Sequence, residues 1–307
     1  MNKKTLKKDF NDLRFLVARH VKLYFKDKQT FFMSLITPLI LVALFATFLR
    51  SVYVDSLQMI LGEIAAPKRL VNGFVAGWLI SSILGTSAVT LAFCSQTIMV
   101  SDKVEKRVED FLITPVKRSV LSLSYFIATV FSTLLVCLAC LVLGLLYIAF
   151  SGWYLSVTDV LLALATLVLC TLFGALLAVI VETFLKSAGA ASAVATLVSS
   201  LYGFVCGAYM PISQFSSSIQ TFVGFVPGTY GTVLFRRCFL DGAIGELATY
   251  LPAEALKGVK DGFDYHFYFN GNLVPAPVCF LILGLTAIIL AAVFLLVVKL
   301  KSKPKKD

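Results

Sequence analysis

Long runs without a charged side chain dominate this sequence. Six stretches contain no Lys, Arg, Asp or Glu, at residues 29–49, 70–101, 119–158, 160–181, 187–235 and 267–298. About 20 helical residues cover the roughly 30 Å hydrocarbon core of a bilayer, so each run is long enough for a membrane-spanning helix. The sequence therefore predicts an all-α membrane protein with six transmembrane helices, near residues 30–52, 71–98, 121–150, 157–183, 187–209 and 276–298.

The composition agrees with this class and not with a soluble domain. Hydrophobic residues make up 59% of the chain and charged residues 14%, whereas about 25% of a soluble domain is charged. The ten-residue alternating strands of a membrane β-barrel are absent from the sequence. We expect three parts: an N-terminal segment over 1–29, a six-span domain over 30–298 and a basic tail over 299–307.

Lys and Arg are distributed unevenly over the connections between these runs. The two ends of the chain, the connection 99–120 and Lys186 hold 20 of the 27 Lys and Arg residues. Because connections rich in Lys and Arg stay in the cytoplasm, this bias predicts cytoplasmic termini and a multi-pass protein of the cell membrane. The tail then lies near anionic lipid, and no folded basic domain indicates a nucleic-acid partner.

The segment 1–29 has its own helical pattern. Its apolar residues recur every three or four positions, at Phe10, Leu13, Val17, Val21 and Tyr24. One face of a helix is therefore apolar, with basic residues on the other faces. This pattern predicts an amphipathic interfacial helix on the inner membrane surface, and partner binding by this arm is the alternative.

The connection 99–120 reads MVSDKVEKRVEDFLITPVKRSV, and nine of its 22 residues are charged. Its apolar residues share one helix face: Val100, Val104, Val108 and Phe111. Opposite charges four positions apart, Asp102 with Lys106 and Lys106 with Asp110, add support for a helix over 101–115. Two interpretations stay open, a solvated connector along the membrane and a docking element for a cytoplasmic protein.

The uncharged run 187–235 is too long for one span. Pro211 and a cluster of serines interrupt it, and only a short apolar run, 219–226, follows before Pro227. A run this short is typical of a re-entrant or interfacial segment. We predict a re-entrant helical hairpin over 210–230 after the fifth span, followed by an extracellular loop over 231–275.

Several of these features together resemble a known family. They are the amphipathic arm, FLITPVKRS at 111–119 between the second and third spans, G-x-x-x-P at 207–211, and GFVPGTYGTVLFRR at 224–237. In this order they resemble the permease subunit of an ATP-binding-cassette exporter of the second type, the ABC-2 type transporter family. The resemblance covers nearly the whole chain.

The resemblance implies a cytoplasmic coupling helix at 101–115 that docks on a separate ABC ATPase subunit. The residues it implies for this contact are Val104, Glu105, Arg107, Val108, Glu109, Phe111, Leu112 and Pro115. ATP and Mg would be bound by that ATPase, so we expect no cofactor and no catalytic residue in this chain. Two permease copies, identical or related, would form the pathway, with the first, second and fifth spans at its centre.

Two hydroxyl stripes are candidates for lining such a pathway. One lies in the second span, at Ser82, Thr86, Thr90 and Thr97, and the other in the fifth, at Ser192, Thr196, Ser199 and Ser200. Hydroxyl groups in spans also bond neighbouring helices, so both interpretations stay open. Gly203 and Gly207 form a G-x-x-x-G pair that would permit close packing of two helices.

Other function classes are less well supported. The chain has no G-x-x-x-x-G-K-[ST] motif, so it lacks the P-loop that would bind ATP. A transporter driven by an ion gradient needs ionisable groups within the spans, and Glu182, at a span end beside Lys186, is read as a surface anchor. A membrane enzyme needs clustered His, Asp or Glu, and the two histidines, His20 and His266, are predicted on opposite sides. The expected function is export of an amphipathic substrate: a drug, antibiotic, lipid-like molecule or peptide.

Overall fold

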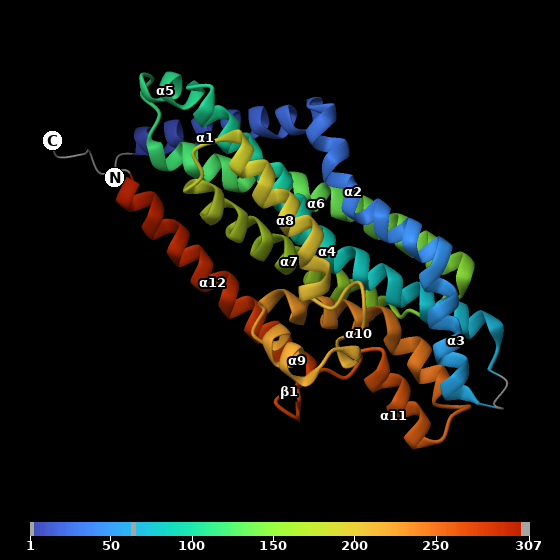
Figure 1. The fold of residues 1–307 in the computed structure, drawn as a ribbon. Helices are drawn as coiled ribbons and strands as arrows, with labels where there is room; N and C mark the ends of the chain where they lie inside the picture. Colours follow the sequence, from blue (N-terminus) through green and yellow to red (C-terminus); the bar gives the residue numbers. More distant parts are fainter. Residues whose placement is uncertain (1–2, 63–65, 302–307) are drawn as a thin grey trace.

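The structure, a computed structural model, describes residues 3–62 and 66–301 and is almost entirely helical (Figure 1). Its helices are α1 (Lys3–Lys26), α2 (Lys28–Leu44), α3 (Arg50–Leu61), α4 (Lys68–Val104), α5 (Arg107–Leu112), α6 (Arg118–Ser151), α7 (Val157–Thr183), α8 (Ala188–Val205), α9 (Ser217–Gly224), α10 (Pro227–Leu247), α11 (Ala253–Gly262) and α12 (Ala276–Lys301). A π-helical turn, η1 (Phe45–Leu49), joins α2 to α3, and a 3₁₀ turn, η2 (Ile212–Gln214), precedes α9. A short antiparallel hairpin, β1 (Tyr268–Phe269) and β2 (Asn272–Leu273), precedes α12.

Six helices in the described part of the chain are long and apolar enough to cross a membrane, at the six predicted places. They are the continuous helix α2–η1–α3 and the helices α4, α6, α7, α8 and α12. The first is longer than predicted, since it runs through η1 to Leu61 instead of ending near residue 52. The fifth is shorter, because α8 ends at Val205.

Helix α4 occupies the centre of the bundle. It packs against α2, α6, α7, α8 and α10, and every residue of its most apolar 18-residue window is buried. Glycines allow this close packing: a Cβ atom on Gly174 of α7 would lie 2.6 Å from the Ala88 carbonyl oxygen of α4. In contrast, only 17% of the corresponding windows of α8 and α12 is buried, so these two helices lie at the periphery.

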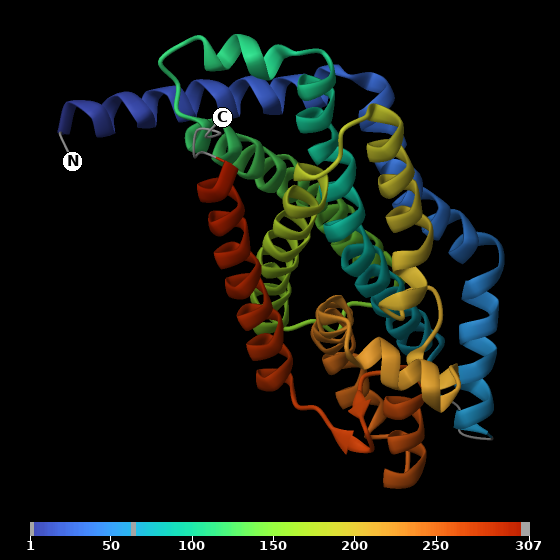
Figure 2. The same ribbon diagram turned by 60° about the vertical axis from the view of Figure 1, so that its left-hand side comes forward.

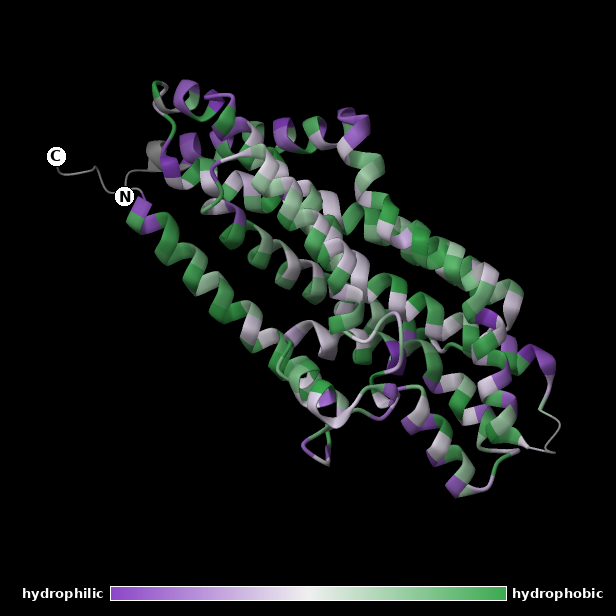
Figure 3. Cartoon of the chain, in the orientation of Figure 1, coloured by the Kyte–Doolittle hydropathy of each residue, from purple (hydrophilic) through white to green (hydrophobic). Residues whose placement is uncertain are grey.

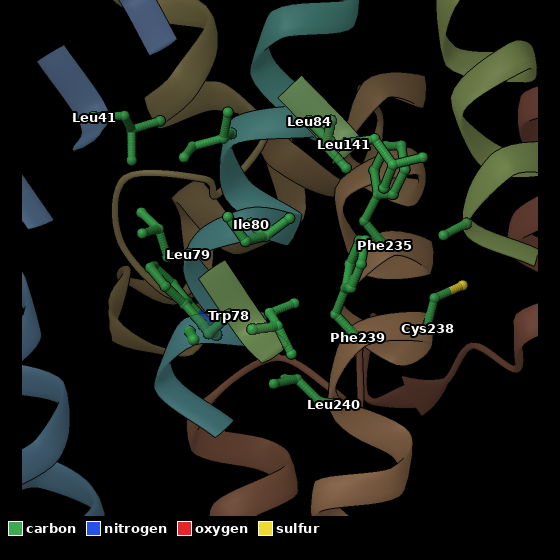
Figure 4. Packing of buried hydrophobic residues seen from close by; sticks show 14 of the residues in the cluster. Leu41, Trp78, Leu79, Ile80, Leu84, Leu141, Phe235, Cys238, Phe239 and Leu240 are labelled. Atoms are coloured by element: carbon green, nitrogen blue, oxygen red, sulfur yellow. The ribbon is translucent and has the colours of Figure 1, made fainter. Parts of the chain in front are cut away.

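The largest group of buried side chains comes from α4 and α10. Figure 4 shows residues of this cluster from α2, α4, α6 and α10: Leu41, Trp78, Leu79, Ile80, Leu84, Leu141, Phe235, Cys238, Phe239 and Leu240. Helix α10 therefore belongs to the core of the bundle. The prediction of an extracellular loop over 231–275 is wrong for residues 231–247, which are helical and mostly buried.

Helix α10 begins at the middle of the bundle and runs toward one end of it. Thr232 lies against Gly85, near the midpoint of α4, while Phe239 lies against Gly77, closer to the first residue of α4. Gly231 lies against Cys170, at the midpoint of α7. The segment predicted as a helical hairpin over 210–230 contains η2, α9 and the first turn of α10, which continues to Leu247.

The two described ends of the chain lie at the same end of the bundle, which we call the terminal end (Figures 1 and 2). Lys117 Nζ is 2.5 Å from the Asp9 carboxylate, and Arg118 of the same segment donates a hydrogen bond to the Lys301 carbonyl. Helix α5 is also at this end, whereas α3, α9, α11 and the β-hairpin lie at the opposite end. Figure 3 shows hydrophilic residues gathered at α1, α5 and α11, with apolar helices between them. The basic tail predicted over 299–307 is described only as far as Lys301.

Helix α1 lies across the terminal end and packs against α6 (Figure 2). From residue 7 onward, where its side chains are described, the buried residues are Leu16, His20 and Tyr24. The predicted apolar face is therefore only partly correct, since Phe10 is 65% exposed. The buried face instead includes His20, which is polar and forms a hydrogen bond with Ser124 of α6. The helix ends at Lys26, where Asp27 caps the next helix by accepting a hydrogen bond from the Thr30 N–H.

Candidate functional site

The predicted helix over 101–115 is divided in two. Helix α4 continues to Val104, and Lys106 adopts a left-handed conformation with φ of 60°. Helix α5 then covers only Arg107–Leu112 and ends in a turn at residues 113–115. The single helix is therefore wrong, and the chain changes direction within the predicted docking element.

Asp102 lies one turn before this break and is fully buried. Arg19 Nη1 and Nη2 donate to its two carboxylate oxygens over 2.7 and 3.2 Å, and the Tyr125 hydroxyl donates over 2.7 Å. Arg107 Nη1 adds a fourth bond of 3.2 Å. Charge-assisted bonds of this kind stabilise the ionised carboxylate. Asp102 thus pairs with arginines from α1 and α5. The sequence pattern had instead indicated a pair with Lys106.

The same cluster contains His20. Its ring stacks on Tyr125 with a centroid distance of 4.0 Å, and its Nε2 atom forms a 3.1 Å hydrogen bond with Ser124 Oγ. Burial, together with the positive charge of Arg19, lowers the pKa of His20 to about 4. The imidazole is therefore neutral at neutral pH. Residues from α1, α4, α5 and α6 meet in this cluster, which we call the Asp102 cluster: Arg19, His20, Asp102, Arg107, Ser124 and Tyr125.

Helix α5 has an inward face and an outward face. Val108 and Phe111 pack against a buried apolar cluster that includes Leu16, Met99 and Leu121. The Arg19 guanidinium lies 5.0 Å from the centre of the Phe111 ring, a cation–π contact. Both side chains are half-buried, so part of each packs on its own chain and only the remainder is available to a partner.

The outward surface is formed by other residues. Ile113, which the sequence analysis missed, is 87% exposed, and Val104 is 47% exposed. The remaining exposed members of the predicted set are Glu105, Arg107, Glu109 and Pro115, while the side chain of Leu112 lies outside the described part of the structure. Ile113 follows directly on the apolar stripe, and its place in a turn rather than a helix explains why helical periodicity did not select it. We call this exposed set the α5 surface.

A cleft of about 920 Å³ runs between α2–η1–α3 on one side and α8 on the other, with Cys94 and Thr97 of α4 at its base. Five of the eight predicted hydroxyl residues line it: Thr97, Ser192, Thr196, Ser199 and Ser200. Apolar side chains such as Met33, Ile40 and Phe48 cover the facing wall. None of its described lining residues is charged, so the cleft suits apolar groups with a few hydrogen-bonding positions.

The other three predicted hydroxyl residues do not line this cleft. Ser82, Thr86 and Thr90 are fully buried within the described chain. The Thr86 hydroxyl donates to the Ser82 carbonyl, one turn earlier in α4. The prediction fails here because α4 is surrounded by other helices, and periodicity cannot tell which of its faces meets a cavity.

The glycine pair predicted for helix packing is also used differently. Gly203 faces the ring of Tyr209, since a Cβ atom at Gly203 would lie 2.3–2.5 Å from its atoms. Gly207 follows the end of α8 and has a φ of 70°, a conformation that favours glycine. Neither glycine therefore lies on an open helix face, and the prediction of a G-x-x-x-G contact is wrong.

A second buried ionic cluster stabilises the opposite end. Arg236 of α10 and Asp264 are both almost fully buried, with 2.5 Å between Nη1 and Oδ2. The backbone N–H groups of Ile212 and Ser213 also donate to the Asp264 carboxylate. The guanidinium lies 4.8 Å from the centre of the Trp78 ring of α4. Both residues fall in the predicted extracellular loop over 231–275, although the pair Arg236-Arg237 at the end of a long uncharged run was a possible signal.

Sequence comparison bears on these sites. A family model described as "ABC-2 type transporter" matches residues 11–240, from α1 through most of α10. The match includes the Asp102 cluster, the α5 surface and the cleft, and it ends before α11 and α12. No curated protein matches the chain. Among the described residues, no group of three or more His, Cys, Asp or Glu side chains could hold a metal ion.

Proposed function

Because the chain belongs to the ABC-2 type transporter family, whose model matches residues 11–240, we propose that it is the permease subunit of an ATP-driven exporter. A separate ABC ATPase would bind ATP and Mg and drive the transport step. The substrate would be amphipathic: a drug, an antibiotic, a lipid-like molecule or a peptide. The protein would lie in the cell membrane with both termini and the terminal end in the cytoplasm, in accordance with its excess of Lys and Arg there.

The observation that carries this proposal is the α5 surface at the terminal end. An exposed isoleucine surrounded by charges of both signs, at a break between two helices, is suited to binding a soluble protein. Burial of Ile113 and Val104 would supply affinity, while Glu105, Arg107 and Glu109 would fix orientation. The contact would thus be made by the exposed residues of the predicted set together with Ile113. Ile113 would take the role that was predicted for Val108 and Phe111.

The cleft between α2 and α8 would be part of the transport pathway. It is open at its side, and both flanking helices expose apolar residues such as Phe32, Ile36 and Leu197. A second permease copy, identical or related, would close the cleft by packing on these faces. The hydroxyl groups of Thr97, Thr196 and Ser199 would then hydrogen-bond polar parts of a substrate whose apolar part contacts α2.

Helix α1 would lie at the inner membrane surface, and the α9–α10 hairpin would enter the membrane from outside. Helix α10 starts level with the midpoints of α4 and α7, which supports a re-entrant arrangement. Its only described charges in the inner half, Arg236 and Arg237, are engaged by Asp264 and by backbone carbonyl groups, as a membrane environment requires.

The proposal is tested by co-purification with the candidate ATPase in mild detergent. Wild-type permease should retain the ATPase, and Ile113→Asp should weaken the complex by tenfold or more, since interface hot spots cost about 2 kcal/mol or more. Val157→Asp is the matched control, because Val157 is 78% exposed but lies at the first turn of α7, at the opposite end.

A wild-type permease that retains no ATPase under these conditions would contradict the proposal. Equal retention by Ile113→Asp and wild type would contradict the assigned surface alone. Substrate transport that needs no ATPase and follows an ion gradient would instead support the alternative, a secondary transporter.

A further inference from the structure

Glu182 occupies an unexpected position near the last turn of α7. The sequence indicates a surface anchor beside Lys186, but the side chain is fully buried. Neither carboxylate oxygen has a hydrogen-bond partner among the described residues. This sets Glu182 apart from Asp102 and Asp264, the two other buried acidic residues of the described chain, each of which accepts hydrogen bonds from several donors.

The nearby lysines do not neutralise this carboxyl group directly. Lys103 Nζ donates to the backbone carbonyls of Glu182 and Thr183 over 3.0 and 3.2 Å, and Lys301 Nζ donates to Thr183 over 2.8 Å. The two ammonium groups thus cap the final carbonyls of α7, a favourable place for positive charge at a helix C-terminus. Lys103 attracts the carboxylate electrostatically, although no ion pair forms between them.

The other titratable groups at this site are few. Cys94 of α4 is near the Glu182 carboxyl group and lines the cleft. Lys186 lies in the connection from α7 to α8, and its positive charge repels that of Lys301. From α6 and α10, which also pack on α7, no charged group interacts with this carboxyl group. An ionised carboxylate that is buried without a partner is so unfavourable that such a group takes up a proton instead.

We propose that Glu182 is a protonation site that holds a proton in this conformation and releases it when the terminal end of the cleft opens. In the proposed step α8 moves away from α4 near Cys94, water reaches the carboxyl group, and Lys103 forms an ion pair with the ionised carboxylate. The inference rests on the proposed transport function for its role in the cycle, but not for the protonation itself.

Infrared spectroscopy of the purified permease tests the protonation without any partner. A protonated carboxyl group has a carbonyl stretch above the amide region, which an ionised carboxylate lacks. Glu182→Gln, which imitates the neutral acid, should lose one such band at neutral pH, and the exposed control Glu246→Gln should lose none. If Glu182→Gln fails to fold, Glu182→Asp should move the band. An unchanged spectrum in both Glu182 variants would overturn the proposal.

The pH dependence of substrate-stimulated ATPase activity tests the link to opening. The closed conformation binds one proton more than the open one. The ratio of open to closed protein should therefore rise by up to about tenfold for each unit by which the pH increases. The wild-type profile should show this dependence, and Glu182→Gln should lose it while Glu246→Gln keeps it. Identical profiles in all three proteins would refute the link. A wild-type permease that retains no ATPase would instead refute the proposed function. The protonation of Glu182 would then be judged from the infrared result alone.

Discussion

At the scale of single residues, the Asp102 cluster joins four helices through side chains that a membrane protein seldom buries. The carboxylate accepts hydrogen bonds from Arg19 of α1 and from Arg107 of α5, which lies beyond the break between α4 and α5 at Lys106. Arg19 in turn contacts Phe111 on the inward face of α5. A displacement of α5 by a bound ATPase would therefore act on α1 and α4 through one carboxylate and one guanidinium.

His20 should make stability depend on pH. Its pKa in the folded protein is lowered to about 4, whereas an unfolded chain has a value near 6.5. The unfolded state therefore binds more protons in this range, and stability is fully present above about pH 6.5 and falls toward pH 4. The loss should reach about 2 kcal/mol at pH 5.

The measurement for His20 is thermal unfolding in detergent at pH 7.5 and pH 5. His20→Gln, which cannot gain a charge, should lose less stability between these two values than wild type does. An equal loss in both proteins would mean that other groups, mainly carboxylates, cause the acid sensitivity.

At the scale of elements, the position of α10 depends on two contacts: a steric one with α4, and an ionic one with Asp264, which follows α11. The steric contact is at Gly77, where a Cβ atom would lie 2.6 Å from the Phe239 carbonyl oxygen. Gly77→Ala should therefore push the two helices apart and lower the unfolding temperature. Gly245→Ala is the control, since no atom lies within 4 Å of its Cβ position, and it should be neutral or stabilising by up to about 1 kcal/mol.

The ionic contact is the pair Arg236–Asp264. Asp264→Asn leaves a buried guanidinium without its counter-charge, so it should destabilise the protein by about 3 kcal/mol or more. The double variant Arg236→Met with Asp264→Leu removes both charges and should recover part of this loss. Thermal unfolding in detergent measures both effects. A double variant less stable than Asp264→Asn would show that the hydrogen bonds to Gly207, Ile212 and Ser213, and not the charge, determine the stability.

At the scale of the whole molecule, the arrangement of the two ends makes a test of orientation possible. Asp110 and Lys257 are both exposed and lie in α5 and α11, at opposite ends. In a cysteine-free background, an impermeant thiol reagent added to intact cells should label Lys257→Cys and not Asp110→Cys. Labelling of Asp110→Cys and not of Lys257→Cys would show that the protein has the opposite orientation in the membrane, with the α5 surface outside the cell.

The sequence by itself determined the class of this protein, the number of its spans and the place of each. Runs of more than 20 uncharged residues have few alternatives to membrane-spanning helices, because every backbone polar group must be paired within the segment. Local signals also indicated helical structure within 101–115 and a break after the fifth span at Pro211, although not the division of the first segment at Lys106. These features depend on hydropathy and on Pro, which act over a few residues.

Only the tertiary structure decided which side chains face inward. Asp102, Glu182 and Arg236 have ionisable side chains, which a sequence alone places at the surface, yet all three are buried. For Asp102 and Arg236 the reason is a counter-charge distant in sequence, 83 and 28 residues away. Likewise, Ser82 and Thr97 share one helical pattern, but only Thr97 reaches the cleft. Periodicity defines the faces of a helix, and the neighbours that cover each face are set by packing, because they come from segments far away along the chain.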